Sequence, residues 1–253
     1  MKTSRQMNLY SETPRLIFLT QNKDPFFAYL TRKIFSEIDT NKKGRLLDLG
    51  CGSGRNIFEA AKRGMEAIGV DYVAKAINLA NNMAKKEGLK KVRFITADLL
   101  SLNPRQFGLF DYIILMEVIE HIKDYQKVIN FTYNSLKKGG MLLLTTPNDP
   151  RQWTILDDYA GHVRRFTIPE LRQALASFKK VKIYTVGFPL HRLTFMAYNM
   201  MMRSQKKTHE PNLFRNNKLV TRIYYWVGSV VLTFDNLFAS TPWGTTIVAI
   251  ARK

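Results

Sequence analysis

Residues 46–54 read LLDLGCGSG, the segment of the chain that says most about its fold. Its first four residues have the apolar character of a buried strand, and three glycines follow at alternate positions: Gly50, Gly52 and Gly54. Glycine lets a ligand approach the backbone closely, so such a turn between a strand and a helix indicates a nucleotide site. A dinucleotide fingerprint would require another glycine where this chain has Arg55.

The sequence on both sides of this turn alternates between short apolar runs and helix-length segments. Such alternation predicts βαβ units and a mainly parallel sheet. The expected strands are Leu46–Leu49, Ala67–Val70, Val92–Ile95, Tyr112–Met116, Met141–Thr145, Val181–Val186 and Thr245–Ala251. Helical spacing predicts a leading helix over Phe26–Ile38, and Pro169 suits the first turn of a helix over Glu170–Phe178. Lys137–Gly140 is expected to stop the helix before the fifth strand.

Three acidic residues stand beside or directly after the first three predicted strands. Asp71 is placed to accept the ribose hydroxyls of a bound nucleoside, and Asp98 to accept an adenine amino group. Asp48 lies beside the glycine turn, within reach of an ammonium group on the ligand. A single aspartate in such a place often caps a helix instead, but three at neighbouring strand ends favour a binding site.

The ordered motifs LLDLGCGSG, GVDY, TADLL, FDYIILMEVIEHI and GGMLLLTTPN resemble those of class I S-adenosylmethionine (SAM) dependent methyltransferases. They cover residues 45–150 and are most similar to the ubiquinone-pathway O-methyltransferases and the methyltransferase type 11 and 23 group. The resemblance implies an α/β fold, a Rossmann-like three-layer α/β/α sandwich. Its seven-stranded, mostly parallel sheet would have the order 3-2-1-4-5-7-6, with SAM across the carboxyl ends of strands 1 to 4.

The resemblance also implies which residues contact SAM. Around the methionine part these are Asp48, Gly50, Cys51, Gly52 and Gly54; around the ribose and adenine they are Asp71, Tyr72, Asp98 and Leu99; near the sulfonium it is Met116.

The segment after the fourth strand bears on the acceptor. Class members that methylate exocyclic amines usually carry Asn/Asp-Pro-Pro-aromatic there, whereas this chain reads MEVIEH, which disfavours base amines. Glu117, Glu120 and His121 would share one face if a helix begins here, and the resemblance links such an E-x-x-E-H segment to a magnesium ion. The favoured alternative is that these side chains only orient the loop.

The stretch Gly161–Thr167 resembles the H-x-R-x-[FY]-[ST] segment of related methyltransferases. His162 is the candidate general base because the imidazole pKa lies near neutrality, with Glu117 and His121 as further catalytic candidates. Arg164 or Arg165 would hold an anionic group of the acceptor. A structural histidine and solvated arginines are the alternatives.

The chain divides into four parts: an N-terminal helical extension (1–44), a SAM-binding core (45–187), an insertion (188–243) and the final strand (244–253). The insertion is far longer than a hairpin loop and is rich in methionine, aromatic and basic residues. It predicts either a lid over the substrate or an element that lies on an anionic membrane. Both alternatives favour an apolar or lipid-like acceptor.

Composition sets further bounds. Hydrophobic residues make up 45% of the 253 residues, enough for a buried core, and the net charge of +19 attracts polyanions in general. The single cysteine excludes an internal disulfide. The N-terminus lacks an apolar signal core, and Ile223–Phe234, the longest apolar run, is shorter than the roughly 20 residues of a membrane span. We expect a cytoplasmic protein, with association at the membrane periphery.

The leading functional hypothesis is O-methylation of a small apolar or lipid-like acceptor such as a quinone precursor. The alternatives are methylation of a cell-envelope glycan or lipid-linked sugar, and an RNA methyltransferase or RNA-binding protein. Nucleic acid is disfavoured as a partner because the chain has no separate RNA-binding motif. The sequence leaves the oligomeric state open.

Overall fold

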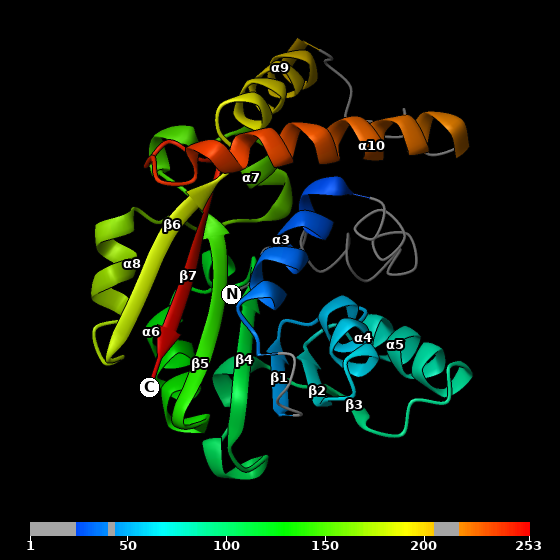
Figure 1. Ribbon diagram of the computed structural model, residues 1–253. Helices are drawn as coiled ribbons and strands as arrows, with labels where there is room; N and C mark the ends of the chain where they lie inside the picture. Colours follow the sequence, from blue (N-terminus) through cyan, green and yellow to red (C-terminus); the bar gives the residue numbers. More distant parts are fainter. Residues whose placement is uncertain (1–23, 40–43, 205–217) are drawn as a thin grey trace.

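The computed structural model describes residues 24–39, 44–204 and 218–253. A central sheet is covered by helices on both faces, and two long helices lie across one end of it (Figure 1). The strands are β1 (Arg45–Leu49), β2 (Glu66–Asp71), β3 (Val92–Thr96), β4 (Phe110–Met116), β5 (Leu136–Pro147), β6 (Lys180–Val186) and β7 (Thr246–Arg252). The helices are α3 (Pro25–Ser36), α4 (Arg55–Lys62), α5 (Ala74–Lys86), α6 (Tyr125–Ser135), α7 (Ile155–Ala160), α8 (Ile168–Ala174), α9 (Leu190–Ser204) and α10 (Lys218–Asp235).

The sheet order is β3-β2-β1-β4-β5-β7-β6, as predicted. β7 runs antiparallel to both β5 and β6, and the other neighbouring strands are parallel. The buried residues form two clusters, and successive strand residues alternate between them: Leu46 belongs to one and Leu47 to the other. This alternation places a hydrophobic layer on each face of the sheet.

The boundaries of β5 and α8 differ most from the prediction, and α8 also ends at Ala174, before the predicted Phe178. β5 begins at Leu136, directly after α6. The register of its pairing with β4 shifts between Leu136 and Met141, so Lys137–Gly140, which was expected to separate the helix from the strand, is an irregularity inside β5. α8 begins earlier than predicted because Thr167 and Glu170 form a capping box. Pro169 lies in the first turn of α8, as expected.

The insertion contributes α9 and α10, joined to the sheet end by a short 3-10 turn, Asn236–Phe238. Asp235 holds the start of α9 by accepting hydrogen bonds from the backbone N–H groups of Leu190 and His191, both at 2.9 Å. α10 packs on α3, so closely that a side chain at Gly228 would overlap Pro25. Residues 205–217, in the middle of the insertion, and residues 1–23 lie outside the described part. Among the described helices, none combines the length and apolar character that crossing a bilayer requires.

Candidate functional site

The glycine turn between β1 and α4 forms one wall of the site. Gly50 and Gly54 have φ angles of 78° and 93°, and an added Cβ would lie 2.6 Å from Val118 and from Phe94, respectively. Packing and backbone conformation therefore both require glycine at these two positions. Gly52 also has a positive φ, but a Cβ there would have nothing within 4 Å. The turn thus has open space above Gly52, where a ligand can approach the backbone.

Two opposite charges lie buried beside this turn. Asp48 is 1% exposed, and burial raises its pKa to about 7, although Asn56 donates a hydrogen bond to it at 3.2 Å. Burial lowers the pKa of Arg55 to about 10, and the guanidinium lies 4.9 Å from the centre of the Phe27 ring. Nε and Nη1 of Arg55 are buried without a hydrogen-bond partner in the described part of the chain. A buried cation with unused donors suits an anionic ligand group.

Arg55 is a residue whose role the sequence alone did not indicate. Sequence reasoning used it only as evidence against a dinucleotide site. The available signal was its place at the first position of a helix directly after the glycine turn, where anions bind favourably.

Asp71 and Asp98 lie at the carboxyl ends of their strands, as predicted. Asp71 is buried and accepts hydrogen bonds from the backbone N–H groups of Gly52 (2.9 Å) and Val73 (2.8 Å), which ties the glycine turn to β2. Asp98 is exposed and caps the 3-10 turn Leu99–Ser101 by accepting from Leu100 N–H at 3.0 Å.

The remaining predicted cofactor residues border these acids. Tyr72 and Leu99 directly follow Asp71 and Asp98 and are half-buried, as is Met116 at the end of β4. Cys51 is buried against Gly69, where a Cβ would lie 2.8 Å from its Sγ, so this thiol packs within the fold. The cofactor candidates thus come from the ends of four adjacent strands, β1 to β4.

The acceptor side differs from the helical arrangement considered above. Only a 3-10 turn, Ile119–His121, follows β4, and Glu117 has a positive φ of 55°. Glu117 accepts a hydrogen bond from Thr145 Oγ1 at 2.8 Å, and Glu120 accepts one from Thr146 Oγ1 at 3.0 Å. Because the chain turns sharply at Glu117, this residue does not join Glu120 and His121 in one cluster.

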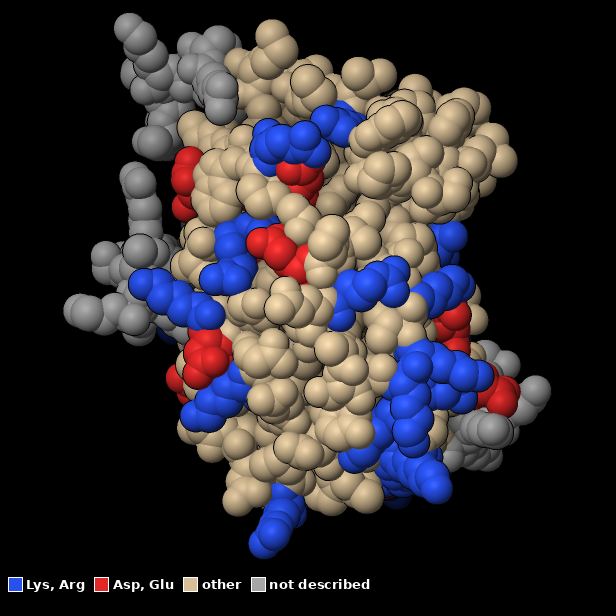
Figure 2. Space-filling model, turned by 90° about the vertical axis from the view of Figure 1, so that its left-hand side faces the viewer, with Lys and Arg blue, Asp and Glu red and all other residues tan. Residues whose placement is uncertain are grey.

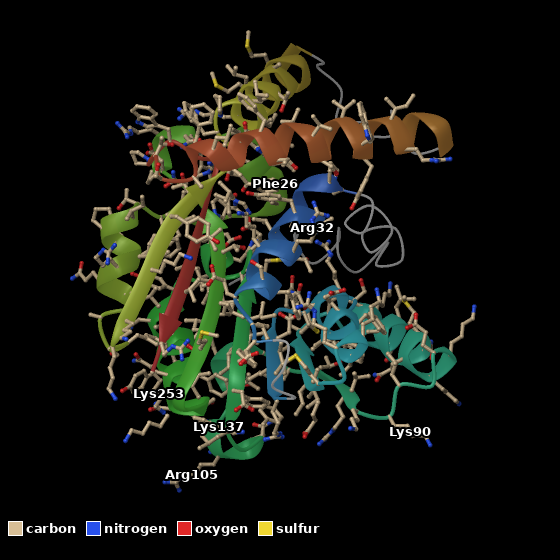
Figure 3. The ribbon with its side chains drawn as sticks, in the orientation of Figure 1. Phe26, Arg32, Lys90, Arg105, Lys137 and Lys253 are labelled. Carbon is tan, nitrogen blue, oxygen red and sulfur yellow. The ribbon has the colours of Figure 1, made fainter. Side chains whose placement is uncertain are left out.

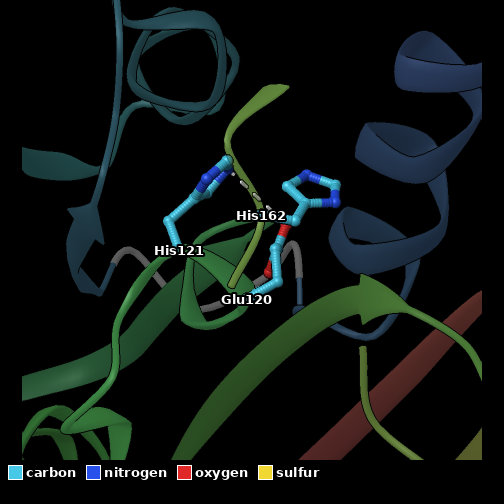
Figure 4. A group of neighbouring side chains, drawn as sticks. All are labelled: Glu120, His121 and His162. Carbon is cyan, nitrogen blue, oxygen red and sulfur yellow. Dashed lines mark ion pairs between the residues drawn. The ribbon is translucent and has the colours of Figure 1, made fainter. Parts of the chain in front are cut away.

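His162 takes the place of Glu117 in that cluster. Glu120, His121 and His162 offer ligand atoms that all lie within 4.8 Å of one another (Figure 4). The imidazole rings of His121 and His162 pack edge to face, with 4.7 Å between their centres. Glu120 is fully buried, its Oε1 has no hydrogen-bond partner in the described part, and burial, reinforced by Glu117, raises its pKa well above the usual value. The cluster could hold either a proton or a cation.

Asp157, which the sequence did not single out, organises the loop around His162. It is 1% exposed and accepts from His162 Nδ1 at 2.7 Å and from Arg165 Nε and Nη2, both at 2.8 Å. Burial raises the pKa of Asp157, but the hydrogen bonds from His162 and Arg165 outweigh it and hold the pKa well below its usual range. The signal in the sequence was a capping box that Thr154 forms with Asp157 at the start of α7.

Both arginines that were expected to hold the acceptor are engaged within the fold. Arg165 is buried and also donates to the Asn148 carbonyl at 3.1 Å. Arg164 lies 4.6 Å from the centre of the Tyr125 ring. The local network holds Arg165, whereas Arg164 Nε is buried without a hydrogen-bond partner in the described part of the chain. A substrate-binding role therefore stays a prediction for Arg164.

The chain matches known families over most of its length. The model of a methyltransferase domain family matches residues 40–209. Ubiquinone biosynthesis O-methyltransferase from Rickettsia canadensis is 26% identical over 183 residues, which cover 70% of this chain and 76% of the relative. The enzyme of the same name from Ruegeria pomeroyi is 32% identical over 136 residues, 50% of this chain and 54% of the relative. In that second case the chain spans about half the length of its relative.

Solved structures agree on the fold. Phosphoethanolamine N-methyltransferase 2 from Haemonchus contortus superposes with a TM-score of 0.68 at 18% identity, covering 98% of this chain and 59% of that one. The [4+2]-cyclase SpnF superposes with a TM-score of 0.59 at 19% identity, covering 89% and 80%. These identities show the fold alone, and a cyclase among the matches illustrates that one fold supports different chemistries.

Proposed function

The chain belongs to the methyltransferase domain family and, by its sheet order, to the class I members that use SAM, and from this premise we propose that it transfers the SAM methyl group to a hydroxyl of a small apolar or lipid-like acceptor, such as a quinone precursor. The single observation that carries the proposal is the His162–Asp157 pair, in a loop that the Val163 N–H ties to the Glu120 carbonyl in the segment after β4. The names of the relatives in ubiquinone biosynthesis support the acceptor class.

The cofactor residues fit SAM. The unused N–H groups of Arg55 suit the methionine carboxylate, and Asp48 suits the ammonium group. Asp71 is assigned to the ribose hydroxyls, and the open space at Gly52 leaves room for the ligand. Asp98, Leu99, Tyr72 and Met116 are assigned to the adenine and the sulfonium edge. When bound, SAM supplies a methyl group already activated by a positive sulfur.

His162 removes the proton of the acceptor hydroxyl in this proposal. Because Asp157 accepts from Nδ1, the hydrogen bond favours the tautomer with its proton on Nδ1 and leaves Nε2 as the acceptor for a substrate proton. Asp157 then stabilises the imidazolium that forms. Deprotonation makes the hydroxyl oxygen a stronger nucleophile, and the loop needs only to align it with the methyl carbon.

A divalent cation held by Glu120, His121 and His162 is the alternative means of activating the hydroxyl. Glu120 Oε1 favours it, because this oxygen has no hydrogen-bond partner in the described part of the chain and lies 4.0 Å from His121 Nε2. Magnesium, however, prefers oxygen ligands, whereas this cluster offers two imidazoles and one carboxylate, a set that better suits a transition metal.

Three variants test the base. We expect His162→Ala to lower kcat by about 10²–10⁴-fold, with the dissociation constant for SAM unchanged. Asp157→Asn should lower kcat and shift the pH profile, because it alters the group that orients the imidazole. His121→Ala is the matched control: it retains activity if His162 acts as a base, and loses activity, as does the chelated enzyme, if a cation is required. Turnover of His162→Ala at the original rate would contradict the proposal.

The same proposal includes association with the membrane periphery, where a lipid-like acceptor is found. A lipid-linked sugar or cell-envelope glycan is the second acceptor class, since it would also be presented at a membrane. RNA is the third and weakest, because the exposed apolar surface described below does not suit a polyanion.

A further inference from the structure

Exposed apolar side chains gather at one end of the molecule. α9, α10 and the turn that follows them contribute Leu193, Met196, Met200, Ile223, Trp226, Val227, Val230, Phe234, Leu237 and Trp243. Several are largely exposed: Met200 by 72%, Trp226 by 68% and Leu237 by 76%. A soluble monomer seldom exposes so many large apolar side chains together, so this surface indicates a site of interaction with another molecule or a membrane.

α10 is apolar on two opposite faces. One face packs inward through Leu232, which is 1% exposed, and through Gly228 against Pro25 of α3. The other carries Ile223, Trp226, Val227, Val230 and Phe234, which recur at intervals of three and four residues and therefore form one continuous stripe. Because the inner face of α10 is already buried against the rest of the fold, packing does not require the apolar residues of the outer stripe.

The neighbouring helix extends the apolar surface. Leu193, Met196 and Met200 are exposed along α9 at the same helical spacing, and α9 contacts α10. In Figure 1 the two helices lie together across the end of the sheet where the parallel strands terminate, which is the end that holds the site. Figure 2 shows a broad area without charged residues at the same end.

The charged residues of the insertion, 188–243, indicate which kind of partner this surface binds. By sequence, the acidic residues of 188–243 are only Glu210 and Asp235, and Asp235 is buried as the cap of α9. The basic residues are Arg192, Arg203, Lys206, Lys207, Arg215, Lys218 and Arg222. Of these, Arg192 on α9 and Arg222 on α10 have side chains that the structure describes. An exposed apolar helix face in a segment that also carries basic residues and tryptophans is typical of elements that lie in the interface of an anionic bilayer.

We propose that the exposed faces of α9 and α10, together with Trp243, form a docking face for an anionic lipid bilayer. α10 lies in the plane of the interface, its outer stripe enters the boundary of the acyl chains, and Arg192 and Arg222 contact lipid phosphates. This inference rests on the membrane-periphery part of the proposed function and names the surface that performs it. At the far end of the molecule Lys90, Arg105, Lys137 and Lys253 extend away from α10 (Figure 3), consistent with an end that stays in water.

Flotation with vesicles tests the docking face. The full chain is mixed at low salt with vesicles of phosphatidylcholine alone or with added phosphatidylglycerol, and centrifuged through a density gradient. We expect flotation with the anionic vesicles and its loss at high salt. The variant Trp226→Gln/Val230→Gln/Phe234→Gln should bind at least about tenfold more weakly, because each change removes an exposed apolar side chain from the stripe.

Leu109→Gln is the matched control, because Leu109 is also exposed (48%) but precedes β4, at the opposite end of the strands. It should float like the unchanged chain. Equal flotation of the triple variant, or no flotation of the unchanged chain, would overturn the inference. So would self-association that the triple variant abolishes without any vesicle binding, since a second copy would then cover the face. SAM affinity and turnover of a detergent-dissolved acceptor should be equal in the triple variant, so failure of the methyl-transfer proposal would be recognised separately.

Discussion

Asp48 and Arg55 show how much of the site is arranged before the cofactor binds. Both side chains are buried beside the glycine turn. Burial raises the pKa of Asp48 and lowers the pKa of Arg55, which favours the neutral form of each. Holding an ionised carboxylate there lowers the stability of the ligand-free protein. A SAM molecule with its ammonium and carboxylate groups would offset that cost.

Asp48→Asn should therefore stabilise the free protein while weakening SAM binding. The folded pKa of about 7 lies above the unfolded value, so the folded state holds the proton more tightly and stability falls as pH rises through that window. Asparagine removes this dependence. The expected gain in Tm at pH 8 is about 2–4 °C for each kcal/mol recovered in a protein of this size, and at pH 4 the gain should vanish.

Thermal melting at both pH values checks this expectation. Asp98→Asn is the control, because Asp98 is exposed and asparagine can also cap the 3-10 turn, so its Tm should match the unchanged protein at both pH values. An Asp48→Asn variant that gains as much stability at pH 4 as at pH 8 would show that desolvation of the carboxylate is not the cause.

At the scale of the element, the glycines of the turn between β1 and α4 have different roles: Gly50 is required for packing, and Gly52 leaves room for the ligand. Gly50→Ala combines a positive φ with an overlap against Val118 and should destabilise the fold by more than about 1–2 kcal/mol. Gly52→Ala should lower the free energy of unfolding by only about 1 kcal/mol, because of its backbone conformation. Its methyl group, however, enters the open space of the cofactor site.

Calorimetric titration with SAM, together with thermal melting, distinguishes the two glycines. Gly52→Ala should keep most of its stability and lose SAM affinity, whereas Gly50→Ala should melt at a clearly lower temperature. If Gly52→Ala bound SAM as tightly as the unchanged chain, the cofactor would not approach the turn at this position.

The elements that could be predicted from the sequence are those whose signals are local. The apolar run before Gly50, the alternation of strands and helices, and the helix with Pro169 in its first turn each depend on neighbouring residues. The turn at Glu117 and the approach of His162 to Glu120 and His121 depend on contacts made only after β4, β5 and the loop that follows α7 come together. For the same reason sequence reasoning grouped Glu117 with His121, and the structure groups His162 with it instead.

At the scale of the whole molecule, the two ends of the sheet have different surroundings. The carboxyl ends of β1 to β4 meet the cofactor residues, and α10 crosses the same end while packing on α3. The sequence identified residues 188–243 as an insertion with apolar and basic character. It could not decide between a lid and a membrane element, because both require apolar residues and differ only in which face of each helix stays exposed.

The most direct test of methyl transfer to a lipid-like acceptor follows labelled methyl from SAM into a cell extract that is then separated into lipid, small-molecule, protein and nucleic-acid fractions. Asp71→Ala is the control, since it removes the carboxylate assigned to the ribose and the tie to Gly52. We expect label in the lipid fraction, as a methyl ether, that is lost in the control. Label in RNA or protein that depends equally on Asp71 would contradict the acceptor class while leaving the cofactor site intact.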